Sequence, residues 1–295
     1  MVDKTVAENP QIARVGGVPS VLNKFRGFIN VGMAQNKDKP EWDAKNFECI
    51  DEVPCWAMVF YLLRAGLLKE AESYVRTNQP QFQKLDRMFA AYLQAYTAHE
   101  DRRLSRQLQD RIHGEYNNRV RHMEDTKDPF KPAVYKILGR CELAKRSLPS
   151  VMPTAEDWMW LQLVLSREID RTSEPAHEVF TLQDLQKSVS QFGAKHFMAK
   201  GSNFGLYFQM LLMCGLFEDV SFSGVPLWER AGGGLTDPAS RLSITYTLSN
   251  MSMACTLPSR LRTTACCGRP RTRSRLNRNC SRSAPTGKSK STSPD

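Results

Sequence analysis

The sequence predicts an all-α protein, built as an irregular solenoid of stacked antiparallel helix pairs with a disordered C-terminal tail. Three observations support this fold class. Apolar residues recur at steps of three and four over much of residues 19–220, which is the spacing of one helix face. No stretch of that region alternates apolar and polar residues convincingly, so we expect roughly nine helices and no strands. Apolar joints centred on glycine separate several helices and suit helices that fold back on each other.

The first expected helices are bounded by proline and glycine. A polar lead-in covers residues 1–18, and a helix is expected over residues 19–33. After a polar linker, Pro54 begins a strongly apolar helix that ends at Gly66, and another helix restarts at Leu67. Proline suits the first helical turn because it lacks a backbone N–H, and glycine suits the left-handed residue that follows a helix.

Further helices are expected over residues 81–97, 104–123, 128–138, 154–169, 181–193 and 203–215. The clearest amphipathic pattern is that of residues 81–97, where aromatic and leucine side chains fall on one face. Thr154 and Asp157 resemble a capping box, with aspartate in the position where glutamate or glutamine is usual. That signal fixes the start of the helix that carries Trp158.

The joints between helices carry much of the fold prediction. Tyr61–Ala71 and Gln209–Asp219 each contain an apolar helix end, then a glycine, then an apolar helix start. Gly139 lies at the centre of a weaker third copy. Such joints favour antiparallel hairpins, which would stack in a row as a solenoid. The alternative arrangement is a compact helical bundle.

The basic charge of the chain is concentrated in its tail. The whole chain has a formal net charge of +10. Residues 221–295 hold 12 Lys+Arg and 3 Asp+Glu, a net charge of +9, which leaves 29 against 28, or +1, for residues 1–220. The net charge therefore gives no reason to expect a nucleic-acid-binding surface on the helical part.

The cysteines predict a reducing compartment, and the apolar segments predict no membrane-spanning helix. None of the eight cysteines forms a Cys-x-x-Cys motif, and Cys55, Cys141 and Cys214 lie in apolar helical contexts that favour buried free thiols in a reducing compartment. Residues 1–15 lack the apolar run of a signal peptide. The longest apolar stretch, Leu206–Phe217, is too short to cross a bilayer. No direct membrane span is expected.

No catalytic, cofactor-binding or metal site emerges from the sequence. There is no phosphate-binding loop and no His-Glu-x-x-His motif. The one dense acid–histidine cluster, His99-Glu100-Asp101, falls in a polar turn where charges are normally solvated. Trp56, Trp158 and Trp160 lie in helical settings typical of a core rather than a ligand box. We therefore expect no enzyme activity, no cofactor and no small-molecule substrate, and the partner-binding residues are not identified.

Several segments resemble one known family and occur in the family's order. They are Glu8–Ser20, Pro54–Arg64, Asp101–Ser105, Asp128–Tyr135, Ile137–Cys141, Glu156–Leu161 and Phe204–Phe217. The run Val15-Gly-Gly-Val-Pro-Ser20 is quite specific to that family. From about Glu8 to Asp219, the chain resembles the nucleoporin interacting component (Nic) family, which supplies the linker nucleoporin of the inner ring of the nuclear pore.

The resemblance implies an α-helical solenoid of the kind shared with vesicle-coat proteins. It implies a structural role in the nuclear pore complex at the nuclear envelope, and indirectly in nucleocytoplasmic transport. The implied partners are other inner-ring nucleoporins, including one that brings a short linear segment to the solenoid. Family members are much longer, so we expect the contacts made by their N-terminal helical motifs and coiled coil to be absent from this chain.

Residues 221–295 depart from the family pattern and become rich in Ser, Thr, Arg and Pro. One hypothesis is a frameshift near residue 220. Codons for Leu261–Arg269 can be chosen so that a shifted frame reads Ala-Tyr-Tyr-Gly-Leu-Leu-Arg, another copy of the glycine-centred joint. A truncated solenoid would then expose an apolar face on its last hairpin, which favours aggregation.

The other hypothesis treats the tail as genuine. Arg269–Ser283 would then be an arginine/serine segment that binds RNA or import factors, and the chain would be a helical adaptor. A solvated tail is the commoner meaning of such a charge run, so nucleic acid is not the expected partner. We expect three regions: a lead-in (1–18), a solenoid fragment (19–220) and a disordered basic tail (221–295).

Overall fold

The computed structural model describes residues 1–16, 20–39, 42–121, 128–169, 175, 178–197 and 204–217. The regular elements of these residues are helices and one small hairpin, which confirms the predicted all-α class. In chain order the helices are α1 (Val2–Glu8), α2 (Pro10–Ala13), α3 (Val21–Gln35), α4 (Cys55–Arg64), α5 (Leu68–Thr77), α6 (Gln79–Leu85), α7 (Phe89–Ala98), α8 (Arg106–Glu115), α9 (Phe130–Gly139), α10 (Ala155–Leu165), α11 (Leu182–Phe197) and α12 (Phe204–Met213). A 3-10 turn covers Ala44–Asn46, and a π-helical turn, Tyr116–Val120, extends α8.

The hairpin corrects the expectation that the chain has no strands. Strands β1 (Cys49–Ile50) and β2 (Val53–Pro54) pair antiparallel between α3 and α4. The two residues that join them, Asp51 and Glu52, both have positive φ angles, of 49° and 64°. Two-residue hairpin turns require this backbone shape because it matches the twist of the strands. Strands of two residues are too short to show a period of two, so the sequence pattern could not reveal them.

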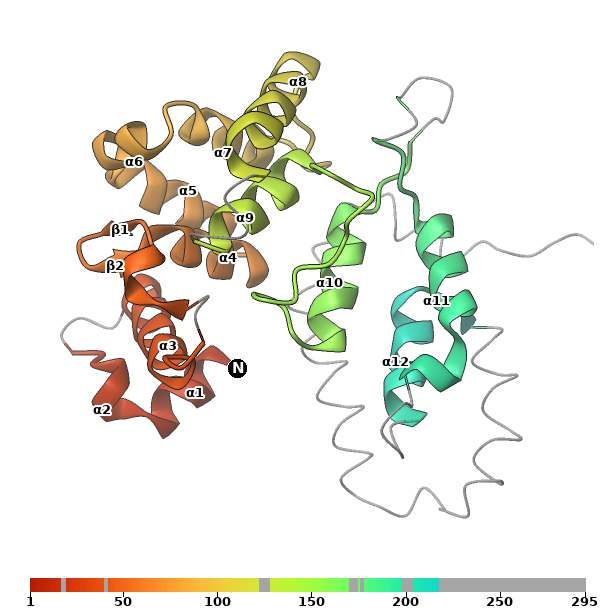
Figure 1. Ribbon diagram of the computed structural model, residues 1–295, viewed down its shortest axis with the longest axis horizontal. Helices are drawn as coiled ribbons and strands as arrows, with labels where there is room; N and C mark the ends of the chain where they lie inside the picture. Colours follow the sequence, from red (N-terminus) through yellow and green to blue (C-terminus); the bar gives the residue numbers. More distant parts are fainter. Residues whose placement is uncertain are drawn as a thin grey trace, which may run out of the picture.

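Two helices lie where the sequence analysis expects only a polar lead-in. Helices α1 and α2 both pack against α3 (Figure 1). Gly27 of α3 permits this close approach, because a Cβ atom at that position would lie 2.5 Å from Val15 Cγ2 and 3.1 Å from the Ala13 carbonyl oxygen. Helices of four to seven residues with mostly polar side chains give little periodic signal. Their stability therefore depends on packing against α3.

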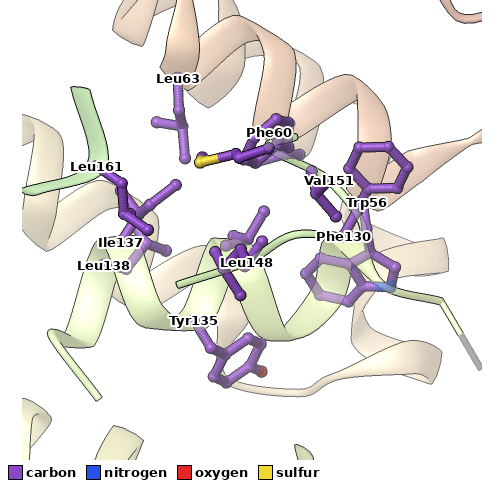
Figure 2. Packing of buried hydrophobic residues seen from close by; sticks show 14 of the residues in the cluster. Trp56, Phe60, Leu63, Phe130, Tyr135, Ile137, Leu138, Leu148, Val151 and Leu161 are labelled. Atoms are coloured by element: carbon purple, nitrogen blue, oxygen red, sulfur yellow. The ribbon is translucent and has the colours of Figure 1, made fainter. Parts of the chain in front are cut away.

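The core is centred on the contact between α4 and α9 (Figure 2). Every residue of α9 is buried. Phe130 of α9 lies 5.4 Å from Phe60 and 5.5 Å from Tyr61 of α4, measured between ring centroids. Trp56 of α4 lies 4.6 Å from Phe89 of α7, nearly perpendicular to it. Because α9 also contacts α7, α8 and α10, helices far apart in the sequence share one aromatic core.

The predicted joint at Gly66 is confirmed, and at Gly215 the predicted helix end is confirmed, whereas the helix start expected after it reaches beyond the described residues. Gly66 has a φ of 77° and Gly215 a φ of 74°, in the left-handed region that glycine occupies at low cost. After α4, the Leu67 N–H donates to the Leu62 carbonyl and the Gly66 N–H to the Leu63 carbonyl. The residues around Gly215 repeat this pattern. The paired bonds end a helix in both places, and after Gly66 the chain turns back so that α5 packs on α4, as the solenoid prediction requires.

The third joint works differently from the prediction. Gly139 is the last residue of α9, and the positive φ angles fall on Arg140 (51°) and Glu142 (53°) instead. Glycine is needed there for another reason, since a Cβ atom would lie 2.8 Å from both Cys141 Sγ and Ile112 Cγ2. The absent side chain therefore allows α8 to pack closely on α9.

Side-chain caps set other boundaries. The helix expected over residues 81–97 is divided, because Asp86 Oδ1 accepts bonds from the Met88 and Phe89 N–H groups, at 2.9 and 3.1 Å, and starts α7 afresh. The predicted Thr154 cap is confirmed, with Thr154 Oγ1 accepting from the Asp157 N–H at 3.1 Å. The helix expected from Leu104 begins at Arg106, and its predicted end at Met123 lies outside the described residues.

Helices α10, α11 and α12 continue the chain as a stack beside the block formed by α1–α9 (Figure 1). Helix α10 contacts α9 and α11, and α11 contacts α12, which is the neighbour-to-neighbour packing of an irregular solenoid. Helix α11 is kinked at Gly193, where φ is 63° and ψ is 176°. In the described ranges every helix is too short or too polar to cross a lipid bilayer.

Candidate protein-interaction surface

A groove of about 550 Å³ lies at the N-terminal end of the molecule. We call it the hairpin groove. One wall comes from the end of α2 and from α3, with Ile12, Arg14 and Arg26, and the other comes from the β1–β2 hairpin, with Asp51 and Glu52. Three segments that are separate in the sequence thus build one concave surface.

The two walls of the hairpin groove carry opposite charges. Arg14 and Arg26 are exposed, and their side chains form no ion pair or hydrogen bond among the described residues. Asp51 and Glu52 of the hairpin line the same groove and are exposed as well. Ile12, which lines the groove, is 42% exposed. The surface therefore combines apolar area with two separated charges of each sign.

A buried hydroxyl group lies beside the groove. Tyr74 of α5 is only 9% exposed, and its hydroxyl has no hydrogen-bond partner among the described residues. Burial raises the pKa of Tyr74 above its usual value, and the nearby charges that act on it include Arg26 and Asp51, two groove residues. The hydroxyl thus stays protonated and can donate to an acceptor.

The hairpin is fixed to the core by a polar cluster that starts at Glu48. The Glu48 carboxylate accepts a bond from Trp56 Nε1 at 2.5 Å and pairs with Lys131 Nζ at 3.1 Å. Asp128 accepts bonds from the Glu48 N–H at 3.3 Å and from the Phe130 N–H at 3.0 Å. Burial raises the pKa of Asp128 to about 7 despite these two bonds. These contacts hold the hairpin on α4 and α9.

A second cavity, of about 430 Å³, lies between the end of α8 and the loop after α9. Its charged side chains bind one another and the backbone. Arg140 Nε donates to the Leu165 carbonyl at 2.9 Å, Arg146 Nη1 donates to the Leu143 carbonyl at 2.6 Å, and Glu142 pairs with Lys136 at 3.1 Å. These contacts join α9 to α10, so this cavity is a structural joint.

An aromatic patch lies on the stack of α10–α12. Phe192 of α11, 46% exposed, stacks on His196 at 4.7 Å and lies 6.0 Å from Trp158 of α10. Phe197 stacks on Tyr207 of α12 at 5.8 Å. Phe217 after α12 is 51% exposed. An apolar surface therefore remains at the C-terminal end of the described stack.

The residues considered from the sequence as candidate catalytic, ligand-binding or metal-binding groups occupy structural positions. His99 caps the end of α7, and Glu100 and Asp101 are exposed in the turn after it. Trp56 is fully buried and Trp160 nearly so, whereas Trp158 is half-buried within the aromatic patch. No cluster of three or more metal-ligating side chains occurs in the described part of the chain. Cys55, Cys141 and Cys214 are buried free thiols, as predicted.

Sequence reasoning missed the hairpin groove. Its charged residues, Arg14, Arg26, Asp51 and Glu52, lie on segments that the sequence analysis treats as polar lead-in, helix and linker. The acidic pair before Pro54 is visible in the sequence, but an acidic pair in a linker is usually solvated. Only the fold brings the four charges to one surface.

Comparisons with known proteins identify the family. A family model described as Nup93/Nic96 matches residues 1–221. The chain is 43% identical over 223 residues to nucleoporin NIC96 of Chaetomium thermophilum, covering 74% of this chain and 20% of that protein. It is 42% identical over 218 residues to the meiotically up-regulated gene 87 protein of Schizosaccharomyces pombe, covering 74% of this chain and 25% of that protein.

A solved structure agrees with these matches. The structure titled Chaetomium thermophilum Nic96 SOL is 40% identical in sequence and superimposes with a TM-score of 0.68, covering 77% of this chain and 32% of that chain. This chain thus spans a fifth to a quarter of the length of the two curated relatives. The family match ends at residue 221, close to the point where the sequence pattern changes. The chain belongs to the Nup93/Nic96 family.

Proposed function

We propose that this chain is a structural segment of the nuclear pore complex, part of the inner-ring scaffold at the nuclear envelope that supports pore assembly and nucleocytoplasmic transport. The observation that carries the proposal is the family match over residues 1–221. It is supported by relatives named as nucleoporin NIC96 and as nuclear pore complex protein Nup93, the latter 32% identical in Xenopus laevis.

The scaffold role needs binding surfaces rather than a reaction centre. Its partners are other inner-ring nucleoporins, one of which brings a short linear segment to the solenoid. This role requires no small molecule, cofactor or nucleic acid. It also requires no catalytic activity and no direct membrane span. An α-solenoid suits it because each helix pair packs on its neighbours and leaves an extended outer surface for partners.

The exposed end of α11–α12 supports a stacking role within a longer scaffold. The curated relatives are four to five times as long as the matched part of this chain. In this proposal Phe192 and Phe217 are covered by further helices or by a partner subunit. The division into lead-in (1–18), solenoid (19–220) and basic tail (221–295) belongs to the same proposal, with α1 and α2 of the lead-in packed on α3.

Localisation and co-purification test the proposal. The chain, fused to a fluorescent protein, is expressed in Schizosaccharomyces pombe and compared with a version that lacks residues 221–295. We expect both to label the nuclear rim and to co-purify inner-ring nucleoporins, because the helical part carries the family match. A folded chain that stays diffuse and retains no nucleoporin would refute the scaffold role. Loss of rim labelling on tail deletion alone would favour the adaptor alternative.

A further inference from the structure

We propose that Ser105 is a phosphorylation site for a serine kinase that recognises arginine, and that its phosphate draws Arg106 away from Glu178. Ser105 lies on the loop between α7 and α8. This loop contacts Arg167, Glu168 and Glu178, which lie between α10 and α11. The inference goes beyond the scaffold role, because it concerns how the α1–α9 block is joined to the stack of α10–α12.

The sequence before Ser105 has the pattern that such kinases recognise. Arg102 and Arg103 precede Ser105 by three and two residues, and no other serine or threonine of the chain has arginine at both of these positions. A kinase whose substrate cleft is lined with carboxylates selects this pattern, because the guanidinium groups pair with those carboxylates while the hydroxyl reaches the catalytic centre. The pattern therefore distinguishes Ser105 from every other hydroxyl of the chain.

The fold leaves the acceptor hydroxyl accessible. Ser105 is exposed, and Arg102–Ser105 form neither helix nor strand. The backbone of Ser105 is extended, with a ψ angle of 154°, so a kinase can bind it without first unwinding a helix. The Ser105 side chain makes no capping bond to α8 and has no hydrogen-bond partner among the described residues. Modification of this hydroxyl therefore breaks no contact that it makes there.

Arg103 is available to a kinase at little cost to the fold. It is exposed, and its Nη2 donates to the Glu168 carbonyl at 2.7 Å. A carboxylate can replace this neutral acceptor, because charge-assisted hydrogen bonds are the stronger ones. At Arg102 the backbone carbonyl accepts a bond from Arg167 Nη2 at 2.6 Å. The loop thus keeps a main-chain link to the stack while Arg103 binds the kinase.

The modification transfers one phosphoryl group from the nucleoside triphosphate that the kinase binds. Ser105 Oγ attacks the terminal phosphorus, and a new O–P bond forms while the bond from that phosphorus to the leaving diphosphate oxygen breaks. The hydroxyl proton passes to the catalytic carboxylate of the kinase, and a nucleoside diphosphate is released. The phosphoserine carries a charge of about −1.5 to −2 at neutral pH.

The phosphate is added next to a residue that joins α8 to the stack. Arg106 Nη1 pairs with Glu178 Oε2 at 3.1 Å, and Arg106 Nη2 pairs with Asp110 at 2.7 Å. Glu178 is only 4% exposed, and His113 Nδ1 lies 3.6 Å from its carboxylate. A phosphate attracts the Arg106 guanidinium more strongly than one carboxylate does, and it repels Glu178. Phosphorylation therefore weakens the Arg106–Glu178 pair, and the start of α11, just after Glu178, is held less firmly.

Phosphorylation of the folded full chain tests the acceptor site. The probe is the catalytic subunit of cyclic-AMP-dependent protein kinase with Mg²⁺ and ATP, and mass spectrometry locates the modified residues and follows their rates. We expect Ser105 to be modified in the folded chain. A synthetic peptide of residues 98–109 should be modified as well, which shows that the kinase accepts the sequence.

Matched comparisons show whether the arginine pattern is read. Arg103→Ala should slow modification of Ser105 by about tenfold. Arg111→Ala removes another exposed arginine of the same surface, on α8, and should leave the rate unchanged. Ser147 is exposed and follows a basic pair, but Arg146 Nη1 donates to the Leu143 carbonyl at 2.6 Å. Ser147 should therefore be modified at least about tenfold more slowly than Ser105.

Hydrogen exchange followed by mass spectrometry tests the effect on Arg106. In the phosphorylated chain the amides of α11 should exchange about threefold to tenfold faster, while those of α4 and α9 keep their rates. Arg106→Gln should give the same increase without phosphorylation. The Ser105→Ala chain, treated with the same kinase, should show no increase, which separates Ser105 from any other modified residue.

The inference is overturned if the folded chain is not modified at Ser105, whether or not the peptide is. It is also overturned if Arg103→Ala modifies as fast as the native chain, if Arg111→Ala slows it equally, or if Ser147 reacts as fast as Ser105. Equal exchange of α11 with and without the phosphate would refute the effect on the Arg106–Glu178 pair. None of these outcomes bears on nuclear-rim localisation, so a failure of this inference can be told apart from a failure of the scaffold role.

Discussion

The block formed by α1–α9 and the stack formed by α10–α12 use the same kinds of side chain for opposite purposes. In the block, Trp56, Phe82, Phe89, Phe130 and Tyr135 are all essentially inaccessible to solvent. In the stack, Phe192 and Phe217 remain about half exposed. An aromatic side chain enclosed on all sides supplies stability, whereas one covered on one side supplies a surface. The block can thus serve as a rigid support while the stack remains available for further packing.

The largest expected effect compares one aromatic residue from each region. Phe130→Ala should lower the free energy of unfolding by about 3–5 kcal/mol, because it opens a cavity among Trp42, Phe47, Phe60 and Tyr61. Phe192→Ala should lower it by less than about 1 kcal/mol. Urea denaturation followed by circular dichroism measures both. Equal losses would break the distinction between block and stack.

A pair of glycines tests how closely the block is packed. Gly139→Ala should lower the free energy of unfolding by about 2 kcal/mol, because its Cβ atom would press on Ile112 and Cys141. Gly114→Ala is the control, since no heavy atom lies within 4 Å of the added Cβ. It should raise the free energy of unfolding by roughly 0.5–1 kcal/mol through better helix propensity. If both changes stabilise the chain, the α8–α9 contact is looser than the distances indicate.

The buried carboxyl group of the block predicts a pH dependence. The pKa of Asp128 is raised to about 7 in the folded chain, above its value of about 4 in the unfolded chain. The folded state therefore binds the proton more tightly, and this group's contribution to stability falls as the pH rises from about 4 to about 7, by an amount on the order of 4 kcal/mol. Urea titrations at several pH values give the free energy of unfolding as a function of pH. This dependence should be flatter for the Asp128→Asn variant than for the native chain. An unchanged profile would mean that Asp128 is ionised throughout that range.

The smallest expected effect concerns the edge of the block. Glu52→Gly should raise the free energy of unfolding by roughly 0.5–1 kcal/mol, because glycine adopts the left-handed shape of the hairpin turn at lower cost than glutamate. Thermal denaturation measures the change, and a lower melting temperature would contradict it.

Local signals in the sequence predicted the parts of the fold that local chemistry decides. Gly66, Gly215 and the Thr154 cap were identified correctly because each satisfies backbone groups within a few residues of itself. Gly139 shared the same local pattern, yet its role depends on Ile112, which lies 27 residues away in the sequence. A sequence pattern cannot distinguish a glycine needed for its backbone angle from one needed for its small size.

The candidate site could not be predicted for the same reason. Arg14, Arg26 and the pair Asp51–Glu52 come from three segments, and Tyr74 comes from a fourth. Each alone resembles an ordinary surface or core residue. The family resemblance correctly predicted the fold, but it identified no binding residue. The gathering of these charges around one groove becomes visible only when the packing of α2, α3 and the hairpin is known.

The burial of α9 also has a consequence for how the chain is made. Helix α4 ends at Arg64, and α9, which packs on it as extensively as α5 does, begins at Phe130. A ribosome adds the intervening 65 residues (65–129) in roughly 3–13 s. During that interval the strongly apolar α4 has no partner from α9 and would be recognised by chaperones that bind exposed apolar segments. A stop codon or a ribosomal stall before residue 139 would extend that exposure indefinitely, so nascent chains of this length should be selective substrates for quality control.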